Sequence, residues 1–334
     1  MEIDNSPLVS ITMSTYNVED FLKDSLESIV NQTYRNLEII IIDDGSTDLT
    51  VSTLKSYALN DERIKLVLKD ANAGLAAARN DALRLATGKY ITFFDGDDIY
   101  DKCLIDKAVS LAENKNSDLV IWDFQIFSKG SELMKWKHKS SKLSHIDVSD
   151  KLALLQIPAF TWIKLLKTQK VRELNIYFPE GKTRQDIPVH WHLITALDKI
   201  TILPEILSYY RQQPEATTYQ NDRRMFDLAY VMDITKEHLK KQGFYEFYKT
   251  QFIKQRLDLL FGMYDRVKKE LKSEALEIID ERFLDEERQY VYGRGDLRIQ
   301  ARWFFRWRCG DFSSLIMYHS WIAVRYFYRM LKSR

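Results

Sequence analysis

The stretch LEIIIIDDGS, residues 37 to 46, decides the fold of this chain. Positions 37 to 42 are apolar except for Glu38, and four consecutive isoleucines are typical of a β-strand. A strand with apolar side chains on both sides is buried on both faces, which is the pattern of a parallel sheet covered by helices. The run stops at Asp43, where a polar turn begins. The sequence therefore predicts an α/β fold.

The segments on either side alternate between strand and helix patterns. Before this stretch, residues 8 to 13 form a β-rich apolar run, and residues 18 to 32 place apolar side chains at helical spacing. After it, the predicted elements are a helix at 49 to 59, a strand at 64 to 68, a helix at 76 to 86, a strand at 90 to 94, and a helix and strand within 104 to 127. We expect a mostly parallel, doubly wound sheet flanked by helices. Because ligands of such sheets bind outside the carboxyl ends of the strands, the polar residues after Met13, Ile42 and Phe94 should converge on one crevice.

The second half of the chain changes character. Residues 128 to 149 are rich in Lys and Ser and are interpreted as a loop, and residues 150 to 210 mix helices and strands. Beyond residue 221 the pattern is almost wholly helical, with candidate helices at 226 to 239, 245 to 267 and 273 to 283. We therefore predict a domain of residues 1 to 220 that carries the crevice and a helical C-terminal region of residues 221 to 334.

Composition excludes several classes of protein. The 334 residues include 49 Lys and Arg against 48 Asp and Glu, and this balance argues against a nucleic-acid-binding protein. Cys103 and Cys309 lie in no metal or redox spacing, as expected in a reducing cytoplasm, and the N-terminus does not resemble a secretory signal. No window approaches the ~20 apolar residues of a membrane-spanning helix. The absence of a Gly-x-Gly-x-x-Gly after the first strand and of a P-loop disfavours a dehydrogenase and a P-loop kinase.

The strongest signal for a functional site is the sequence FFDGDD, residues 93 to 98, in which carboxylates follow a buried strand directly. Hard divalent cations take oxygen ligands, and Mg²⁺ is often held by one or two carboxylates together with substrate phosphates. Asp95 and Asp97 fit that requirement. The alternative is a simple turn in which Asp97 or Asp98 caps the next helix.

Two further polar clusters follow predicted strands. The cluster from Asp43 to Asp48 could be only an Asx turn, but it ends a strand beside the first one, where a carboxylate can accept hydrogen bonds from a base or a ribose. Residues 72 to 74, Asn-Ala-Gly, offer a turn glycine that brings the backbone close to a ligand. Arg79 suits a phosphate or a base, although an arginine on a helix is more often solvated.

Together these motifs resemble family 2 glycosyltransferases of the GT-A fold, which is Rossmann-like. The residues that carry the resemblance are, in order, Val9-Ser10-Ile11 with Thr15-Tyr16-Asn17, Ser25 to Ile29 with Gln32-Thr33-Tyr34, Asp43 to Asp48, Asn72 to Asn80, and Gly88-Lys89-Tyr90 with Asp95 to Asp98. The likeness is close over residues 7 to about 110 and looser to about 220.

The resemblance implies a donor site for a nucleotide sugar and a divalent metal, Mn²⁺ or Mg²⁺. Thr15 and Tyr16 would line the nucleobase pocket, and Asp43 or Asp44 would hold uracil or ribose. Asp97 would be the principal metal ligand, and Asp95 would contact the ribose or the metal sphere, so that the pair forms the DXD motif of the family. The donor-binding residues implied in this way are Thr15, Tyr16, Asp43, Asp44, Asn72, Gly74, Arg79, Asp95, Gly96 and Asp97.

The same resemblance implies that Asp186 is the general base. An inverting transfer needs one displacement, in which a carboxylate takes the proton of the acceptor hydroxyl while the metal stabilises the leaving diphosphate. Gln185 departs from the usual glutamate of the family. The alternative for Asp186 is a helix N-cap. Candidate acceptor or phosphate contacts are Lys164, Gln185, His190 and Arg211, of which His190 is otherwise a packed or surface helix residue.

These expectations combine into one enzymatic hypothesis. The chain would move a sugar from a UDP-sugar donor to a glycan or a polyprenyl-diphosphate-linked acceptor, as in the synthesis of a bacterial surface polysaccharide such as O-antigen or capsule. The competing hypothesis is a non-catalytic relative that binds a nucleotide or glycan as a scaffold. Loss of Asp95, Asp97 or Asp186 would favour the scaffold, and all three are present.

Residues 290 to 334 form a basic, aromatic tail. Eight arginines and Lys332 face only Asp296 and Asp311, and several Trp, Phe and Tyr residues are interleaved with these cations. Such a composition is typical of a helix on an anionic bilayer surface, so we expect a cytoplasmic protein bound peripherally to the inner face of the cell membrane. The alternative is a helical cap whose aromatic side chains pack on the catalytic domain.

Overall fold

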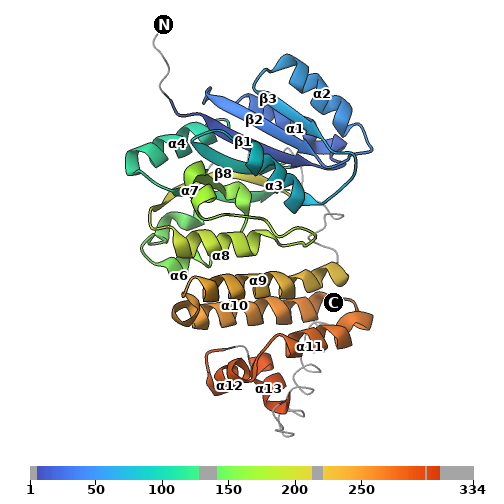
Figure 1. The fold of residues 1–334 in the computed structure, drawn as a ribbon, viewed down its shortest axis with the longest axis vertical. Helices are drawn as coiled ribbons and strands as arrows, with labels where there is room; N and C mark the ends of the chain where they lie inside the picture. Colours follow the sequence, from blue (N-terminus) through green and yellow to red (C-terminus); the bar gives the residue numbers. More distant parts are fainter. Residues whose placement is uncertain (1–5, 128–140, 213–220, 298, 309–334) are drawn as a thin grey trace. The chain divides into compact units, whose positions relative to one another are not determined.

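The computed structural model describes residues 6–127, 141–212, 221–297 and 299–308. The chain divides into two compact units, Met1–Tyr219 and Gln220–Arg334 (Figure 1). The strands of the first unit are β1 Val9–Thr15, β2 Leu37–Asp43, β3 Ile64–Leu68, β4 Tyr90–Asp95, β5 Ile99–Tyr100, β6 Leu119–Phe127, β7 Lys164–Lys167 and β8 Ile200–Arg211. Its helices are α1 Glu19–Val30, α2 Thr50–Asn60, α3 Leu75–Leu85, α4 Leu104–Lys115, α6 Lys151–Leu154, α7 Thr168–Glu173 and α8 Asp186–Ala196, with 3₁₀ turns η2 Lys142–His145 and η3 Thr161–Ile163.

One eight-stranded sheet organises the first unit, in the order β3-β2-β1-β4-β7-β6-β8-β5. Strands β1 to β4 are parallel to one another, as the alternation of strands and helices predicts. Every residue of β2 is buried, because α3 packs against β1 and β2 and the other helices cover the rest of the sheet. The prediction of a mostly parallel α/β sheet flanked by helices is confirmed.

Strand β7 is the main departure from the expected topology. The helix and strand predicted within residues 104 to 127 are present as α4 and β6, but β6 does not pair with β4. Instead β7 lies between them and is antiparallel to both. Strand β8 then runs parallel to β6 with a bulge near Asp123. This arrangement extends the sheet beyond β4. Strand β7 pairs with residues 90 to 92 of β4, and β8 pairs with β5, the short strand that follows β4.

The second unit is helical. Its helices are α9 Asp227–Lys241, α10 Tyr245–Arg266, α11 Lys272–Glu281, α12 Asp285–Gly293 and α13 Ile299–Arg308, with 3₁₀ turns η5 Arg223–Phe226 and η6 Lys269–Leu271. Besides its apolar core it holds a buried carboxylate, Glu287, which accepts a hydrogen bond from Tyr245 (2.5 Å) and pairs with Lys236 (2.9 Å). Because a buried charge needs partners, this cluster fixes α12 against α9 and α10. No helix among the described residues is long and apolar enough to cross a membrane.

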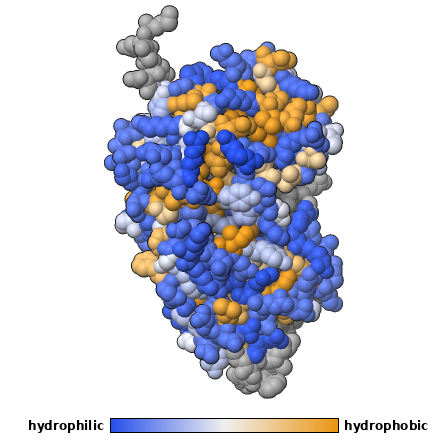
Figure 2. Space-filling view, viewed as in Figure 1, coloured by the Kyte–Doolittle hydropathy of each residue, from blue (hydrophilic) through white to orange (hydrophobic). Residues whose placement is uncertain are grey.

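The described part of the predicted membrane-binding tail packs inward. Phe304 and Phe305 on α13 are buried, with ring centroids 6.0 Å from Phe261 and 4.8 Å from Phe283 respectively. Arg308 pairs with Asp280. The described surface of this unit is mostly hydrophilic, with isolated hydrophobic side chains, in the view of Figure 2. These aromatic residues of α13 therefore pack on Phe261 and Phe283 within the second unit itself, whereas the alternative placed such packing on the catalytic domain, and residues 309–334 of the tail lie outside the described part of the chain.

Candidate active site

The ends of the first three neighbouring strands meet, as their order in the sheet requires. Thr15 at the end of β1 lies opposite Asp43 in register, and its hydroxyl donates to the Asp43 carboxylate at 3.0 Å. Gly96 follows β4, and a Cβ atom there would lie 2.8 Å from the Thr15 side chain, so only glycine allows this close approach. The carboxyl ends of β1, β2 and β4 therefore converge, as predicted.

Asp43 organises its own turn in this structure. Its carboxylate accepts hydrogen bonds from the Ser46 backbone N–H (2.9 Å) and hydroxyl (2.6 Å), three residues further along the chain, and these bonds close the turn after β2. Gly45 has φ +80°, and a Cβ there would lie 2.8 Å from the Ala71 backbone carbon. The glycine is thus required on two grounds, and it lets the loop after β2 contact the loop after β3.

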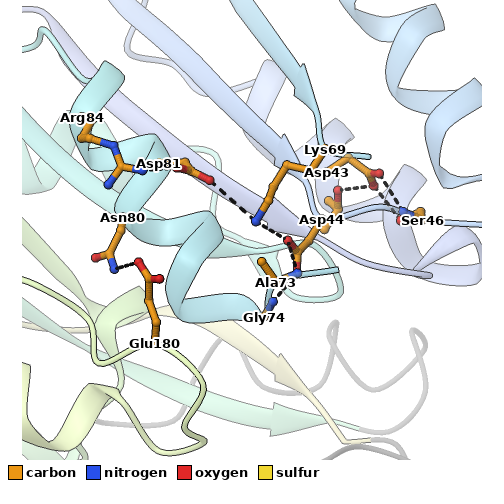
Figure 3. Close-up of polar contacts among 11 residues, drawn as sticks. Asp43, Asp44, Ser46, Lys69, Ala73, Gly74, Asn80, Asp81, Arg84 and Glu180 are labelled. Atoms are coloured by element: carbon orange, nitrogen blue, oxygen red, sulfur yellow. Dashed lines mark hydrogen bonds and ion pairs between the residues drawn. The ribbon is translucent and has the colours of Figure 1, made fainter. Parts of the chain in front are cut away.

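Asp44 holds the turn at residues 72 to 74. It is 3% exposed, and its carboxylate accepts from the backbone N–H groups of Gly74 (2.7 Å) and Ala73 (3.1 Å) while pairing with Lys69 (2.6 Å). Figure 3 shows Asp44 directed toward this turn and Asp43 directed toward Ser46. Gly74 has φ +92°, and Asn72 is exposed at the surface of the turn. Asp44 therefore sets the position of backbone and side chains that the sequence predicts to contact the donor.

Tyr16 is the exposed aromatic residue of this crevice. It follows Thr15 directly, and its side chain is 46% exposed whereas Thr15 is buried. The buried Thr15 ties β1 to β2, so the exposed Tyr16 directly follows the converging strand ends. An exposed aromatic ring offers a flat face on which a nucleobase can stack.

Arg79 joins two carboxylates that are far apart in the sequence. From α3 it donates through Nη1 to Asp186 Oδ1 (2.5 Å) and through Nη2 to Asp95 Oδ1 (2.8 Å), and it is only 1% exposed. Burial alone would lower the pKa of Arg79, but Asp186 and Asp95 raise it above its ordinary value. The guanidinium is therefore a fixed positive charge between two acids, and the alternative of a solvated helix residue is wrong.

Asp186 is the first residue of α8. The residue in the N-cap position is Gln185, so the alternative that Asp186 caps the helix is wrong. Its Oδ1 also accepts a hydrogen bond from the Thr161 hydroxyl at 2.7 Å. Both hydrogen bonds that we find to this carboxylate among the described residues go to Oδ1, while the side chain is 19% exposed. Asp186 is thus oriented through one oxygen, which leaves Oδ2 to interact with a substrate.

Three carboxylates crowd together after β4. Burial raises the pKa of Asp97 to about 6, with help from the charge of Asp95. Burial likewise raises the pKa of Asp95, although Arg79 opposes the shift, and it raises the pKa of Asp98 well above its ordinary value. Mutually repelling, partly dehydrated carboxylates are stabilised by a cation, so Asp95 and Asp97 fit a divalent metal ion.

Asp98 has a structural role that differs from the expected helix cap. It is buried and accepts a hydrogen bond from the backbone N–H of Arg211 on β8 at 2.8 Å. The next helix, α4, starts at Leu104 and has Cys103 in its N-cap position. The capping alternative is therefore wrong for Asp97 and Asp98.

The described residues do not form a complete metal cage. Among them, no group of three or more His, Cys, Asp or Glu side chains is arranged to hold an ion. Mg²⁺ and similar ions are commonly bound by one or two carboxylates with phosphate oxygens and water completing the shell. Asp95 and Asp97 match that type of site, in which the metal and a diphosphate bind together.

The four candidate acceptor or phosphate contacts are buried. Lys164 donates to the Phe160 carbonyl, and burial lowers its pKa to about 7. His190 is packed inside, as its ordinary interpretation predicts, and burial holds its pKa well below the usual value; Gln185 is also buried. Arg211 donates from Nε to the Asp97 carbonyl at 2.9 Å. In this structure all four side chains therefore lie in the interior of the protein.

Several supporting residues were not predicted from the sequence. Thr161 orients Asp186, and it lies three residues before Lys164, which was predicted as an acceptor or phosphate contact. Asn80 receives a hydrogen bond from the Phe178 backbone N–H (3.0 Å) and donates to Glu180 (2.9 Å), which ties α3 to the segment before α8 (Figure 3). Asn80 could have been identified from its position beside Arg79, whereas Thr161 is adjacent to no predicted functional residue.

Comparison with known proteins identifies the family. The family model described as Glycosyl transferase family 2 matches residues 10–177. An uncharacterized glycosyltransferase of Haemophilus influenzae is 30% identical over 223 residues, which cover 65% of this chain and 69% of that protein. Escherichia coli WfgD, named as a UDP-Glc:alpha-D-GlcNAc-diphosphoundecaprenol beta-1,3-glucosyltransferase, is 36% identical over 129 residues, 39% of this chain and 50% of that protein.

Solved structures confirm the fold. Staphylococcus aureus TarS, crystallised in complex with UDP-GlcNAc, superimposes with a TM-score of 0.72 at 18% sequence identity, over 92% of this chain and 88% of that chain. The GT-A fold expected from the motifs is therefore present. Since the family model spans half of the chain and contains the converging strand ends described above, this protein belongs to glycosyl transferase family 2 and is a glycosyltransferase.

Proposed function

We propose that this enzyme transfers a sugar from a UDP-sugar to a hydroxyl group of a glycan or lipid-linked glycan, with inversion and with the help of a divalent metal. The observation that carries the proposal is the Arg79 bridge, which places Asp186 and Asp95 on the same guanidinium. A candidate base and a candidate metal carboxylate are thereby held side by side. The UDP-GlcNAc complex of TarS and the named reaction of WfgD support the donor and acceptor classes.

The donor would lie across the ends of β1, β2 and β4. The exposed ring of Tyr16 would stack on the uracil, and the turn that Asp44 holds at residues 72 to 74 would border the ribose. Asp95 and Asp97 would hold the metal against the diphosphate, where it neutralises the charge of the leaving group. Burial and the charge of Asp95 raise the pKa of Asp97, and a bound cation would offset both effects.

The chemical step would need only one displacement. The acceptor hydroxyl gives its proton to Oδ2 of Asp186 while its oxygen attacks the anomeric carbon, and the bond from that carbon to the UDP oxygen breaks. Attack from the side opposite to the leaving group inverts the anomeric centre. Arg79 and Thr161 both hold Oδ1, so the free oxygen is aimed without being consumed by an internal hydrogen bond. We assign these steps to residues 1 to 220.

The substitution Asp186→Asn tests the proposal directly. It keeps the shape of the side chain and removes its ability to accept a proton, so we expect transfer to fall by about 10²–10⁴-fold. Donor binding should be unchanged, because Asp186 is assigned to the acceptor hydroxyl and not to the donor. It is measured as the thermal shift caused by UDP-sugars with Mn²⁺, since a ligand that binds only the folded state raises its stability. Asp198→Asn, at a side chain that is 91% exposed, is the matched control.

The panel for this experiment contains UDP-, GDP-, CDP- and dTDP-sugars with and without Mn²⁺. A shift with one UDP-sugar that requires metal would identify the donor for the transfer assay. Full transfer by Asp186→Asn would refute the base assignment. No shift with any nucleotide would favour the competing hypothesis of a non-catalytic scaffold.

A further inference from the structure

We propose that four aromatic side chains, Phe124, Phe160, Trp162 and Tyr210, form an acceptor subsite that binds the C–H face of a pyranose ring. We call this group the aromatic cluster. The inference rests on the proposed function, because it uses Asp186 as the base that the acceptor hydroxyl must reach. It goes further by assigning the place and the chemical class of the acceptor group.

The rings of the aromatic cluster are in mutual contact. Phe160 stacks on Trp162 with a centroid distance of 4.9 Å, and Trp162 stacks on Tyr210 at 5.6 Å. Phe124 meets Phe160 and Trp162 edge to face at 5.4 and 5.1 Å. Trp162 is 2% exposed, whereas the other three rings keep part of their surface accessible. The tryptophan is thus a core residue, and three partly exposed rings surround it.

Two covalent neighbours tie the cluster to the site. Phe160 precedes Thr161, whose hydroxyl binds the Asp186 carboxylate at 2.7 Å. Tyr210 precedes Arg211, whose Nε binds the Asp97 carbonyl at 2.9 Å. Consecutive Cα atoms lie only about 3.8 Å apart, so Phe160 is one residue away from a contact to the base, and Tyr210 is one residue away from a contact to the backbone of Asp97.

The centroids of Phe160 and Tyr210 are 5.9 Å apart. The cluster therefore connects the residue before Thr161, which contacts the base, with the residue before Arg211, which contacts Asp97. During transfer the acceptor oxygen must lie between Asp186 and the anomeric carbon, and the donor diphosphate must lie at Asp97. The acceptor sugar therefore has to enter beside these rings.

The chemistry of the cluster suits a sugar. A pyranose presents C–H groups on its faces and hydroxyl groups around its edge, and an aromatic face attracts the weakly positive hydrogens of C–H groups. Binding sites for small molecules commonly combine such apolar surfaces with a few convergent polar groups. Here the aromatic rings supply the apolar surface, and Asp186 supplies the polar group that receives the reacting hydroxyl.

Saturation-transfer NMR with methyl β-D-glucopyranoside and methyl β-D-N-acetylglucosaminide tests the subsite in the full chain. With UDP and Mg²⁺ present, irradiation of aromatic protons should give signals on the C–H protons of at least one of these two probes. In Phe160→Leu, which keeps an apolar side chain and loses the ring, we expect the signal to fall about fivefold. Phe247→Leu, at an aromatic residue that is 78% exposed on α10, should leave it unchanged.

The thermal shift caused by UDP separates the outcomes. If UDP stabilises the wild type and Phe160→Leu equally, the donor site is intact in both, and a weaker sugar signal in the variant supports the subsite. Equal sugar signals in Phe160→Leu and wild type, or no signal with either probe in the wild type, would overturn it. Loss of the UDP shift in the wild type would instead contradict the proposed function itself.

Discussion

Asp97 is the carboxylate of the proposed metal site whose pKa is raised toward neutrality. Its pKa is raised to about 6 by burial and by the neighbouring Asp95, so the carboxylate is ionised at neutral pH but begins to take up a proton just below it. A metal ligand must be deprotonated, and protons therefore compete with the metal. Burial and the charge of Asp95 destabilise the ionised form of Asp97, and a bound cation would stabilise that form.

We predict that metal affinity falls as the pH is lowered through 6. Between pH 7 and pH 5 the ionised fraction of Asp97 drops, so the dissociation constant for Mn²⁺ in the presence of UDP should rise about tenfold. Isothermal titration calorimetry measures it. In Asp97→Asn both metal binding and transfer should be lost, whereas Asp70→Asn, at an exposed carboxylate, should keep the wild-type profile. A metal affinity that is constant between pH 5 and pH 7 would contradict the role of Asp97.

The individual residues of the site were predictable where a motif carried them, and their partners were not. Asp95, Asp97 and Asp186 could be named because short motifs place them after predicted strands or in a known order. The contact between Arg79 and Asp186 spans 107 residues of sequence, and local periodicity carries no information about such a distance. The burial of Lys164 was missed for the same reason, since it depends on packing against distant segments.

Strand β2 contributes to the protein at both of its ends. Its carboxyl end supplies Asp43 and Asp44, and near its other end Glu38 accepts hydrogen bonds from Ser10 (2.6 Å) and the Thr87 backbone N–H (2.6 Å) and pairs with Lys65 (2.6 Å). Burial alone would raise the pKa of Glu38, but these partners outweigh it and lower the pKa from 4.5 to about 2. Glu38, the single polar residue among positions 37 to 42, thus connects β1, β3 and the turn before β4.

Glu38→Gln should destabilise the first unit by on the order of 2 kcal/mol at neutral pH. A folded-state pKa below the unfolded value means that the contribution is complete above pH 4.5 and is lost as the pH falls toward 2. Urea unfolding at several pH values measures the difference, which should shrink in acid. Glu62→Gln, at an exposed glutamate, is the control. A difference that is equal at pH 7 and pH 3 would exclude this electrostatic origin.

Elements with strong periodicity were predicted closely. The strand at residues 64 to 68 has the predicted bounds, and α10 starts at the predicted Tyr245. The central position of β7 was not predicted, because four residues leave too short a pattern to reveal which strands they pair with. Pairing between strands depends on the tertiary fold, whereas the type of each long element depends mainly on its own sequence.

At the scale of the whole molecule, the extent of the core of the second unit decides which parts of the tail can be removed. Phe304 and Phe305 belong to the core of the second unit, so a truncation that starts at residue 290 would damage that core. Residues 309 to 334 hold Arg325, Arg329, Lys332 and Arg334 against the single acid Asp311. A membrane test should therefore remove only this last segment.

We predict that the full chain sediments with liposomes that contain anionic lipid and that deletion of residues 309 to 334 weakens this binding. Basic residues near an anionic surface contribute about 1 kcal/mol each, and salt screens them. A variant with Arg325, Arg329 and Lys332 replaced by glutamine keeps the chain length and should lose most of the salt-sensitive binding. If both variants sediment with anionic liposomes as the full chain does, the tail does not bind the membrane through these residues, and packing of the whole tail is favoured.

The link from α3 to α8 also determines when the catalytic centre can form during synthesis. Strands β1 to β4 and Arg79 leave the ribosome before Thr161, Phe178 and Asp186 have been made. The nascent chain can thus pair its parallel strands early, and domains often begin to fold while the rest of the chain is being translated. The base can join Arg79 only after at least 186 residues have been synthesised. Long-range contacts of this kind form slowly. We therefore expect strands β1 to β4, which carry the proposed donor site, to fold before Asp186, the proposed base, reaches Arg79.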